Sequence, residues 1–346
     1  MYYEFASKHF HKSSQVPRNL NKKELAYDGW RGAGKGLSSR VRRMFLDMDP
    51  GIDDAVAMLL ASQLKDVEVL GVSTVAGNVD VVKTTRNALK IVEFLGLRAG
   101  VYRGSSRPLI RPHENSADIH GNDGLGGVAL PEPRIRADPL PGPMAMAEFA
   151  RAEPGKVTLV ATGPLTNVAI ACMLDMDFPG HVKQLVIMGG AFSLAPYGKG
   201  NVSQFAEYNI YADPEAANLV FTSFQDILCV GLDVTMHPDL LVKQEDLNRL
   251  RKSGSRMGSL AADIMGFSVR RMGYFAPHDP LAVYCVHDQA IVSTKRGRVK
   301  VVTDLQGERG RTILETDSEK SNVSVASAVD GTRFKEELLG ALERAR

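Results

Sequence analysis

The sequence is poor in cysteine and has no long apolar run. An odd number of cysteines, at no spacing typical of metal ligands, argues against a disulfide framework; they are Cys172, Cys229 and Cys285. No apolar run reaches the ~18 residues that a membrane-spanning helix needs. The first residues also lack the apolar core of a secretory signal. We therefore expect a soluble, reduced, cytoplasmic protein with no membrane partner.

The small formal net charge of +2 hides an uneven distribution. Residues 1–43 carry ten Lys or Arg against three acidic residues, a net charge of +7, which leaves −5 for the rest of the chain. The same segment has no apolar periodicity and contains the only tryptophan, Trp30. We predict a basic, disordered extension over residues 1–43. An organelle-directing tail, a nucleic-acid contact and a translation start at Met44 are the alternatives, and we expect no nucleic-acid partner.

From residue 44 onward, strand-like and helix-like segments alternate. Strands are predicted over residues 67–75, 157–161, 182–188 and 227–232, and helices over 80–95, 165–174 and 214–224. This alternation predicts an α/β fold with an open, mostly parallel sheet and helices on both faces. With 44% hydrophobic residues and no linker-like segment, residues 44–346 are expected to form a single domain.

Four aspartates cluster where a short predicted strand ends. Asp47 and Asp49 follow apolar residues, and after a Pro-Gly turn Asp53 and Asp54 stand at the start of a strongly apolar helix. Like charges this close raise one another's pKa unless a cation offsets them, which favours a bound divalent metal. Carboxylate oxygens suit calcium or magnesium. Helix N-capping is the alternative, but it explains only Asp53 and Asp54.

Glycine and polar residues follow three further predicted strands. These sequences are Ala76-Gly77-Asn78, Thr162-Gly163-Pro164-Leu165-Thr166-Asn167 and Met188-Gly189-Gly190. One such turn is ordinary loop chemistry. Together with the aspartate cluster they make four in series, and ligands of open α/β sheets bind at the carboxyl ends of strands. We therefore predict one site along one edge of the sheet.

Three polar clusters lie outside these strand ends. His120-Gly121-Asn122-Asp123-Gly124 lies within residues 108–143, a stretch poor in regular structure that we expect to fold over the site. The others are residues 200–209 and His278-Asp279-Pro280. For an isolated histidine beside a turn residue, a purely structural role is the alternative interpretation.

Seven short motifs occur in a fixed order along the chain. They occupy residues 47–54, 74–78, 120–126, 161–167, 188–190, 206–209 and 277–280. In this order they resemble the inosine-uridine preferring nucleoside hydrolase family, whereas residues 1–43 have no counterpart there. The resemblance implies the Rossmann-like fold of that family and hydrolysis of ribonucleosides to ribose and free base.

The resemblance also implies a calcium ion and its protein ligands. The residues at the matching positions are Asp49, Asp54, the backbone carbonyl of Thr162, and Asp279. Calcium would lower the pKa of a bound water. Asp49 would then act as the general base while that water attacks the anomeric carbon.

A set of ribose contacts follows from the same resemblance. Asp53 and Asn209 match residues that bind the 2′ and 3′ hydroxyls, and Asn78 matches a residue that supports the acid cluster. The positions around the 5′ hydroxyl are Met188, Asn201 and Glu207.

Cleavage of the N-glycosidic bond is expected to pass through an oxocarbenium-like ribosyl state, while negative charge accumulates on the leaving base. By resemblance, His278 is the general acid that protonates the base, and His120 is a base contact or accessory donor. Within residues 266–275, Arg271 and Tyr274 are further candidate base contacts, with an exposed basic helix as the alternative, so the preferred base is left open.

Two other functions fit part of the pattern. A phosphatase could use Asp47 and Asp49 as its nucleophile loop, but Asp53 and Asp54 follow at once, where that mechanism needs a free position. A nucleoside- or ribose-binding module without turnover would keep the same pocket. The resemblance implies a homodimer or homotetramer, and the amphipathic residues 333–342 are expected to cover the sheet rather than mediate assembly.

Overall fold

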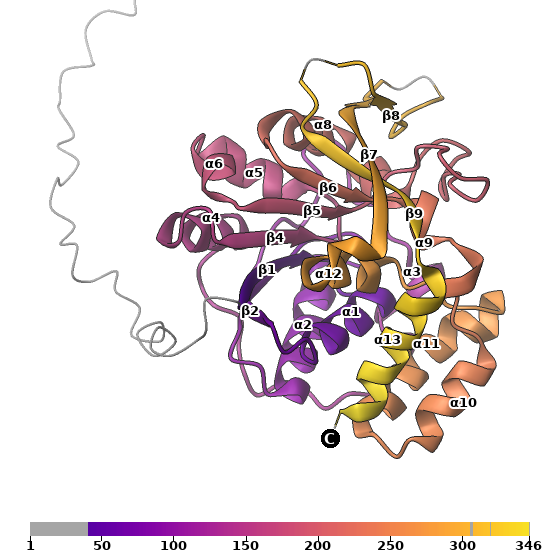
Figure 1. Ribbon diagram of the computed structural model, residues 1–346. Helices are drawn as coiled ribbons and strands as arrows, with labels where there is room; N and C mark the ends of the chain where they lie inside the picture. The colour runs from indigo at the N-terminus through magenta and orange to yellow at the C-terminus, as the bar shows by residue number, and fades with distance from the viewer. Residues whose placement is uncertain (1–40, 305–306, 319, 346) are drawn as a thin grey trace, which may run out of the picture. The chain divides into compact units, whose positions relative to one another are not determined.

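The computed structural model describes residues 41–304, 307–318 and 320–345 (Figure 1). In this part of the chain, nine strands form one sheet in the order β3-β2-β1-β4-β5-β6-β9-β7-β8. The strands are β1 (Arg42–Met48), β2 (Val67–Thr74), β3 (Gly100–Arg103), β4 (Val157–Ala161), β5 (Gln184–Met188), β6 (Ile227–Val230), β7 (Val292–Val301), β8 (Thr312–Glu315) and β9 (Val323–Val329).

Thirteen α-helices connect or flank these strands in the described residues. They are α1 (Ile52–Ala61), α2 (Val81–Leu95), α3 (Ala117–His120), α4 (Gly142–Ala152), α5 (Thr166–Leu174), α6 (Phe178–His181), α7 (Tyr208–Ala212), α8 (Pro214–Ser223), α9 (Leu232–Thr235), α10 (Gln244–Lys252), α11 (Arg256–Met272), α12 (His278–His287) and α13 (Gly331–Arg344). Within the described residues, none of these helices is both long and apolar enough to cross a membrane.

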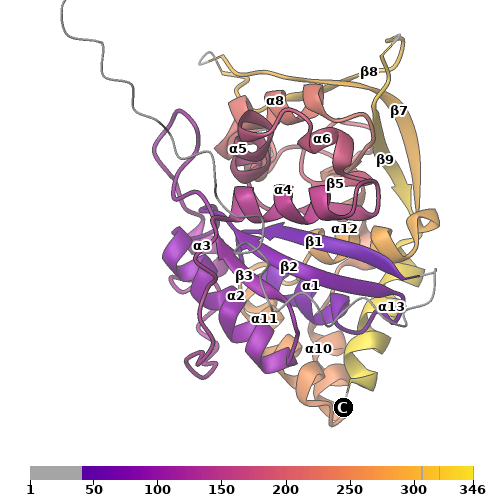
Figure 2. The same cartoon turned by 90° about the vertical axis from the view of Figure 1, so that its left-hand side faces the viewer.

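The sheet separates two hydrophobic cores, because successive strand residues point to opposite faces. On β1, Met44 and Leu46 pack with α1, α11 and α12, whereas Phe45 packs with α4 and α5. Figure 2 shows α4, α5, α6 and α8 on one side of the sheet and α1, α2, α10, α11 and α13 on the other. The predicted mostly parallel sheet with helices on both faces is therefore confirmed.

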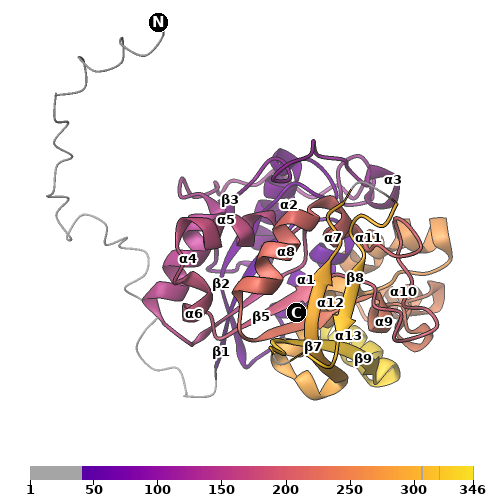
Figure 3. The same ribbon diagram turned by 90° about the horizontal axis from the view of Figure 1, so that it is seen from above.

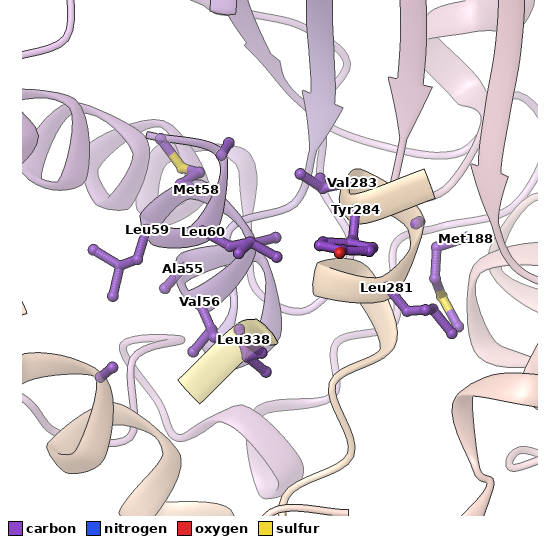
Figure 4. Close-up of a cluster of buried hydrophobic side chains, with 14 of the residues drawn as sticks. Ala55, Val56, Met58, Leu59, Leu60, Met188, Leu281, Val283, Tyr284 and Leu338 are labelled. Atoms are coloured by element: carbon purple, nitrogen blue, oxygen red, sulfur yellow. The ribbon is translucent and has the colours of Figure 1, made fainter. Parts of the chain in front are cut away.

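Helix α1 has a strongly apolar sequence after its first turn, and almost the whole helix is buried. Nine of its ten residues are buried and only Asp53 is partly accessible. The side chains of Leu60 in α1 and Tyr284 in α12 lie toward each other beneath the sheet (Figure 4). This packing fixes the start of α1, and with it the position of the acidic residues that precede and open the helix.

The strand register brings the ends of the central strands to one edge. Asp47 pairs with both Ser73 of β2 and Ala161 of β4, and Met188 of β5 pairs with Val230 of β6, all in parallel ladders. The segments that follow these strands therefore meet at a single sheet edge, as predicted. At the β8 end of the sheet, β7 runs antiparallel to both β8 and β9. Strand β3 lies at the opposite end (Figure 3).

Two details differ from expectation. β1 begins at Arg42, so regular structure starts two residues before position 44, and residues 1–40 of the predicted basic extension lie outside the described residues. The C-terminal helix α13 packs mainly on the 3-10 helix η1 (Pro238–Leu240) and on α11, α1 and α10, and not on the sheet, because these helices already cover that face.

Candidate active site

A cavity of about 410 Å³ opens at the carboxyl edge of the sheet. Most residues predicted for the site line it: Asp53, Asn78, His120, Thr162, Met188, Asn201, Glu207, Asn209, His278 and Asp279. Asp49 and Asp54, the other two, are fully buried beside it. The structure thus gathers the predicted residues at one place, while their individual roles stay predictions.

The N-termini of helices α1 and α12 both lie at the acidic cluster. Asp53 and Asp54 stand in the first turn of α1, and Asp279 stands in the first turn of α12. The positive end of a helix dipole favours negative charge at this position. Asp54 also accepts hydrogen bonds from the backbone N–H of Gly51 (3.0 Å) and the hydroxyl of Thr162 (2.8 Å). This carboxylate therefore joins the N-terminus of α1 to the segment that follows β4.

Asp49 lies in a cradle made by glycines. Its Oδ2 accepts a hydrogen bond from the backbone N–H of Asn78 (2.7 Å), while Oδ1 has no hydrogen-bond partner in the described part of the chain. A β-carbon at Gly77 would overlap Oδ2, and one at Gly163 would lie 2.7 Å from Oδ1. The glycines of the second and fourth motifs are thus explained by the space that the Asp49 carboxylate needs.

Asn78 connects the acidic cluster to the segment above it. Its side-chain amide donates to the Asp49 backbone carbonyl (3.1 Å) and to Asp54 Oδ2 (3.2 Å). Its Oδ1 accepts a hydrogen bond from the hydroxyl of Ser116 (3.1 Å). Asn78 therefore orients the acids directly, which agrees with the supporting position expected for it.

Burial makes the ionised state of these carboxyl groups costly. It raises the pKa of Asp47 and Asp53 to about 7, and it raises the pKa of Asp49 and Asp279 well above the ordinary range, with neighbouring carboxylates adding to the effect. Carboxylate oxygens of Asp53, Asp54 and Asp279 lie within 4.8 Å of one another. A cation bound here would offset the repulsion, so the donor set fits a hard divalent metal ion.

This group of three carboxylates differs from the expected ligand set. It includes Asp53, which we expected on the ribose, and it leaves out Asp49, which we expected on the metal. The reason is geometric, because Asp49 Oδ2 is turned toward the Asn78 backbone, whereas carboxylate oxygens of Asp53 and Asp279 lie close to that of Asp54. Asp47 lies deeper, bonded to Asn167 (2.8 Å) and to Ser73, consistent with a role in ordering the strand end.

The expected ribose side of the cavity is built around α7. Asn209 donates from its side-chain amide to the carbonyls of Thr162 (2.7 Å) and Met188 (3.2 Å). Glu207 is the N-cap of α7 and accepts hydrogen bonds from the backbone N–H groups of Asn209, Ile210 and Gly190. Burial raises the pKa of Glu207. Glu207 therefore has a structural function in addition to lining the cavity.

The two predicted histidines both line the cavity. The backbone N–H of Ile52 donates to His120 Nδ1 (3.1 Å), so the neutral ring carries its hydrogen on Nε2. His278 Nδ1 lies 2.7 Å from the hydroxyl oxygen of Thr235. Burial lowers the pKa of His120 to about 3 and that of His278 to about 4. Both rings are therefore neutral at pH 7 in the metal-free protein.

Comparison with known proteins identifies the family. A model of the inosine-uridine preferring nucleoside hydrolases matches residues 44–336. This chain belongs to that family. It is 39% identical over 269 residues to uridine nucleosidase 1 of Arabidopsis thaliana, covering 75% of this chain and 78% of the relative. It is 35% identical over 317 residues to the inosine-uridine preferring nucleoside hydrolase of Crithidia fasciculata, covering 88% and 98%. A solved plant nucleoside hydrolase superposes with a TM-score of 0.82 at 31% identity, over 88% of this chain and 99% of that one.

The cavity of this family member also contains residues that the sequence did not single out. They are Ile52, Ser116, Ile119, Lys199, Gly200, Val202, Tyr208, Leu232, Met236, Ser268, Met272, Phe275 and Ala276. Most are apolar and typical of any core, so the sequence carries no signal for them. Of the two candidate base contacts, Tyr274 lines the cavity, whereas Arg271 is half-exposed and lies 4.0 Å from Asp118.

Proposed function

We propose that this chain hydrolyses the N-glycosidic bond of ribonucleosides and releases ribose and free base. One observation supports this most strongly: a single cavity joins buried carboxylates, an asparagine-lined side and two histidines. This is the set of groups needed to hold a ribose, activate water and protonate a leaving base. The names of the Arabidopsis and Crithidia relatives favour uridine and inosine as substrates.

The cofactor is proposed to be Ca²⁺, held by Asp49, Asp54, the carbonyl of Thr162, and Asp279. Support comes from Oδ1 of Asp49, which is buried and has no hydrogen-bond partner among the described residues, and from the closeness of the Asp54 and Asp279 carboxylates. When bound, the ion would keep the carboxylates ionised and lower the pKa of a coordinated water. Asp53 is proposed to bind ribose, and its closeness to Asp54 and Asp279 supports a ribose contact beside the proposed ion.

The remaining residues are proposed to bind the ribose and to activate the attacking water. Asp49 accepts the proton of the water that attacks the anomeric carbon, as its glycine cradle leaves Oδ1 free of other donors. Asp53 and Asn209 bind the 2′ and 3′ hydroxyls. Positive charge that develops on the oxocarbenium-like ribosyl group is stabilised by the surrounding carboxylates. The 5′ hydroxyl end is bound by Met188, Asn201 and Glu207.

The leaving base is proposed to receive its proton from His278, whose neutral ring first takes up a proton from solvent as charge develops on the base. Negative charge that develops on the base raises the pKa of a ring facing it, which counteracts the lowering by burial. His120 presents its Nε2–H to the cavity because its Nδ1 is occupied by Ile52. It is therefore suited to donate a hydrogen bond to the base without gaining a second proton.

A panel of nucleosides tests the proposed function. Free ribose is measured from inosine, uridine, cytidine and adenosine, with and without a calcium-specific chelator, and free phosphate is measured from nucleotides in parallel. Ribose release that the chelator abolishes supports the proposal. Nucleoside binding without ribose release would favour the binding-module alternative, and phosphate release would favour the phosphatase.

We further propose that residues 44–346 act as one hydrolase domain in a cytoplasmic homodimer or homotetramer. The family match over residues 44–336 supports a single domain. Size-exclusion chromatography with light scattering measures the assembly, and a monomeric active enzyme would contradict this part of the proposal.

A further inference from the structure

A second cavity, of about 330 Å³, lies next to the candidate active site. The side chain of Tyr208 lines both cavities and so forms part of the wall between them. Tyr208 opens helix α7, between the N-cap residue Glu207 and the cavity residue Asn209. Its backbone is therefore held firmly, and its ring has a defined direction.

The hydroxyl of Tyr208 connects two other segments of the chain. It lies 2.8 Å from the carbonyl oxygen of Gly77 and 2.9 Å from the carbonyl oxygen of Glu114, and it can donate its single hydrogen to either. Gly77 precedes Asn78, which orients the acids. Glu114 lies on the segment that leads into α3 and His120. One side chain of α7 thus touches both the base of the cavity and the segment that covers it.

The covering segment has little apolar packing to hold it. None of residues 110–120 is buried, and Ile110 is 71% exposed. Segments of this kind open with small free energies, since few buried contacts must break. Its attachment therefore depends on hydrogen bonds.

Three of these bonds reach the residues after β2. His113 Nε2 lies 2.7 Å from the Gly77 carbonyl oxygen, the Ser116 backbone N–H donates to the Asn78 carbonyl (3.0 Å), and the Ser116 hydroxyl donates to Asn78 Oδ1 (3.1 Å). Tyr208 adds a contact from a different element, α7. The segment is then held from two sides, above the cavity that His120 lines.

We propose that Tyr208 is a positioning residue, whose hydroxyl fastens residues 113–120 over the active site and so keeps His120 and Asn78 in their substrate-binding positions. The inference rests on the proposed hydrolase function, because it assigns Tyr208 a part in substrate binding. Tyr208 acts through the segment that it holds and does not itself touch the reacting atoms.

The variant Tyr208→Phe removes the hydroxyl and keeps the ring that separates the cavities. When residues 113–120 are less often in place, the apparent affinity for nucleoside falls in proportion to the fraction of molecules that can bind it. Loss of one such hydrogen bond predicts a KM about three- to tenfold higher. The turnover number kcat stays the same, because the segment is in place whenever substrate is bound.

Tyr211→Phe is the matched control. Tyr211 lies one turn further along α7 and lines the second cavity, but among the described residues its hydroxyl makes no hydrogen bond. The chemical change is identical, so any general effect of losing a tyrosine hydroxyl appears in both variants. We expect KM, kcat and the melting temperature of Tyr211→Phe to equal those of the wild type.

Hydrogen exchange measured by mass spectrometry tests the inference without reference to activity. We expect faster exchange in peptides covering residues 113–120 of Tyr208→Phe, and wild-type exchange in Tyr211→Phe. The melting temperature of Tyr208→Phe should stay within about 2 °C of the wild type, since the change is local. Unchanged exchange in residues 113–120 of Tyr208→Phe would overturn the inference.

Steady-state kinetics on uridine and 5′-deoxyuridine separate positioning from direct contact. If Tyr208 acts through the covering segment, Tyr208→Phe raises KM by the same factor for both substrates. A KM effect that disappears with 5′-deoxyuridine would mean direct contact with the 5′ hydroxyl and would overturn the inference. If the wild type releases no ribose from any nucleoside, the proposed function fails, while the exchange comparison still decides the role of Tyr208.

Discussion

The substitution Gly77→Ala tests whether the space around Asp49 determines the site. A β-carbon at position 77 would overlap Asp49 Oδ2 and lie 2.8 Å from Cδ of Pro164, while the backbone at Gly77 has no positive φ angle. The added methyl group therefore acts through sterics alone. Either the Asp49 carboxylate must turn away from the Asn78 N–H, or the loop after β2 must move away from Pro164.

Both responses have a known cost. A hydrogen bond to a charged group contributes about 1.5–3 kcal/mol, and overpacking costs about 1–3 kcal/mol. We therefore expect Gly77→Ala to lower the free energy of unfolding by about 2–4 kcal/mol and the melting temperature by about 4–8 °C. Displacement of Asp49 should also lower kcat about 100-fold, because a general base must hold its position within a fraction of an ångström.

Thermal melts and ribose release from uridine measure these effects. Gly180→Ala is the control, since a β-carbon there would meet nothing within 4 Å and the backbone again has no positive φ angle. Its stability should stay within about 0.5 kcal/mol of the wild type. A Gly77→Ala variant that melts and turns over like the wild type would refute the steric explanation of this motif.

Three further results are expected. A calcium-specific chelator should abolish ribose release and lower the melting temperature. Added calcium at 100 times its dissociation constant should raise the free energy of unfolding by about 2.7 kcal/mol. A melting temperature that does not respond to calcium would contradict the proposed metal site. In the chelated protein, stability should fall as pH rises from about 4 to about 7 and level off above that, because Asp47 and Asp53 have a pKa of about 7 when folded against 3.8 in the unfolded chain, so over this range the folded state keeps protons that the unfolded chain has released. Melts at several pH values check this, and Asp47→Asn should flatten the slope. Asn209→Asp should reduce kcat/KM at least about 30-fold. The variant loses the donor to the carbonyls of Thr162 and Met188 and adds a charge beside buried carboxylates. A kcat/KM within twofold of the wild type would exclude a role of Asn209 in binding ribose.

The sequence was most informative where a strand ends in glycine and polar residues. Parallel strands end at a common edge, so the segments after β1, β2, β4 and β5 could be placed together before any coordinates. The alternation of residues 157–161 and 166–174 was equally clear, because a short β-branched run and a longer apolar helix differ in length and composition.

The C-terminal third was harder to predict. Strands β7, β8 and β9 were not predicted. In the sheet, β9 lies between β6 and β7, although β7 and β8 both precede it in the chain. Pairing over such a separation depends on tertiary contacts that no local pattern encodes. The placement of α13 on other helices also depends on tertiary contacts, since an amphipathic pattern does not indicate which element the apolar face packs against.

Within the site, residue types were predictable but their exact partners were not. The family resemblance implied Asp49, Asp54 and Asp279 as one set, whereas side-chain directions bring Asp53 together with Asp54 and Asp279. Tyr208 stands in the motif at residues 206–209, but its role was not predicted, because its hydroxyl contacts two backbone carbonyls far away in the chain.

The central claim is that Asp49 serves as general base for ribonucleoside hydrolysis. Ribose release from saturating uridine, measured for the wild type and for Asp49→Asn in excess calcium, tests it most directly. We predict turnover by the wild type and a loss of at least about 1,000-fold in the variant, as expected when a base is removed together with its charge. Equal ribose release by the two proteins would contradict the account.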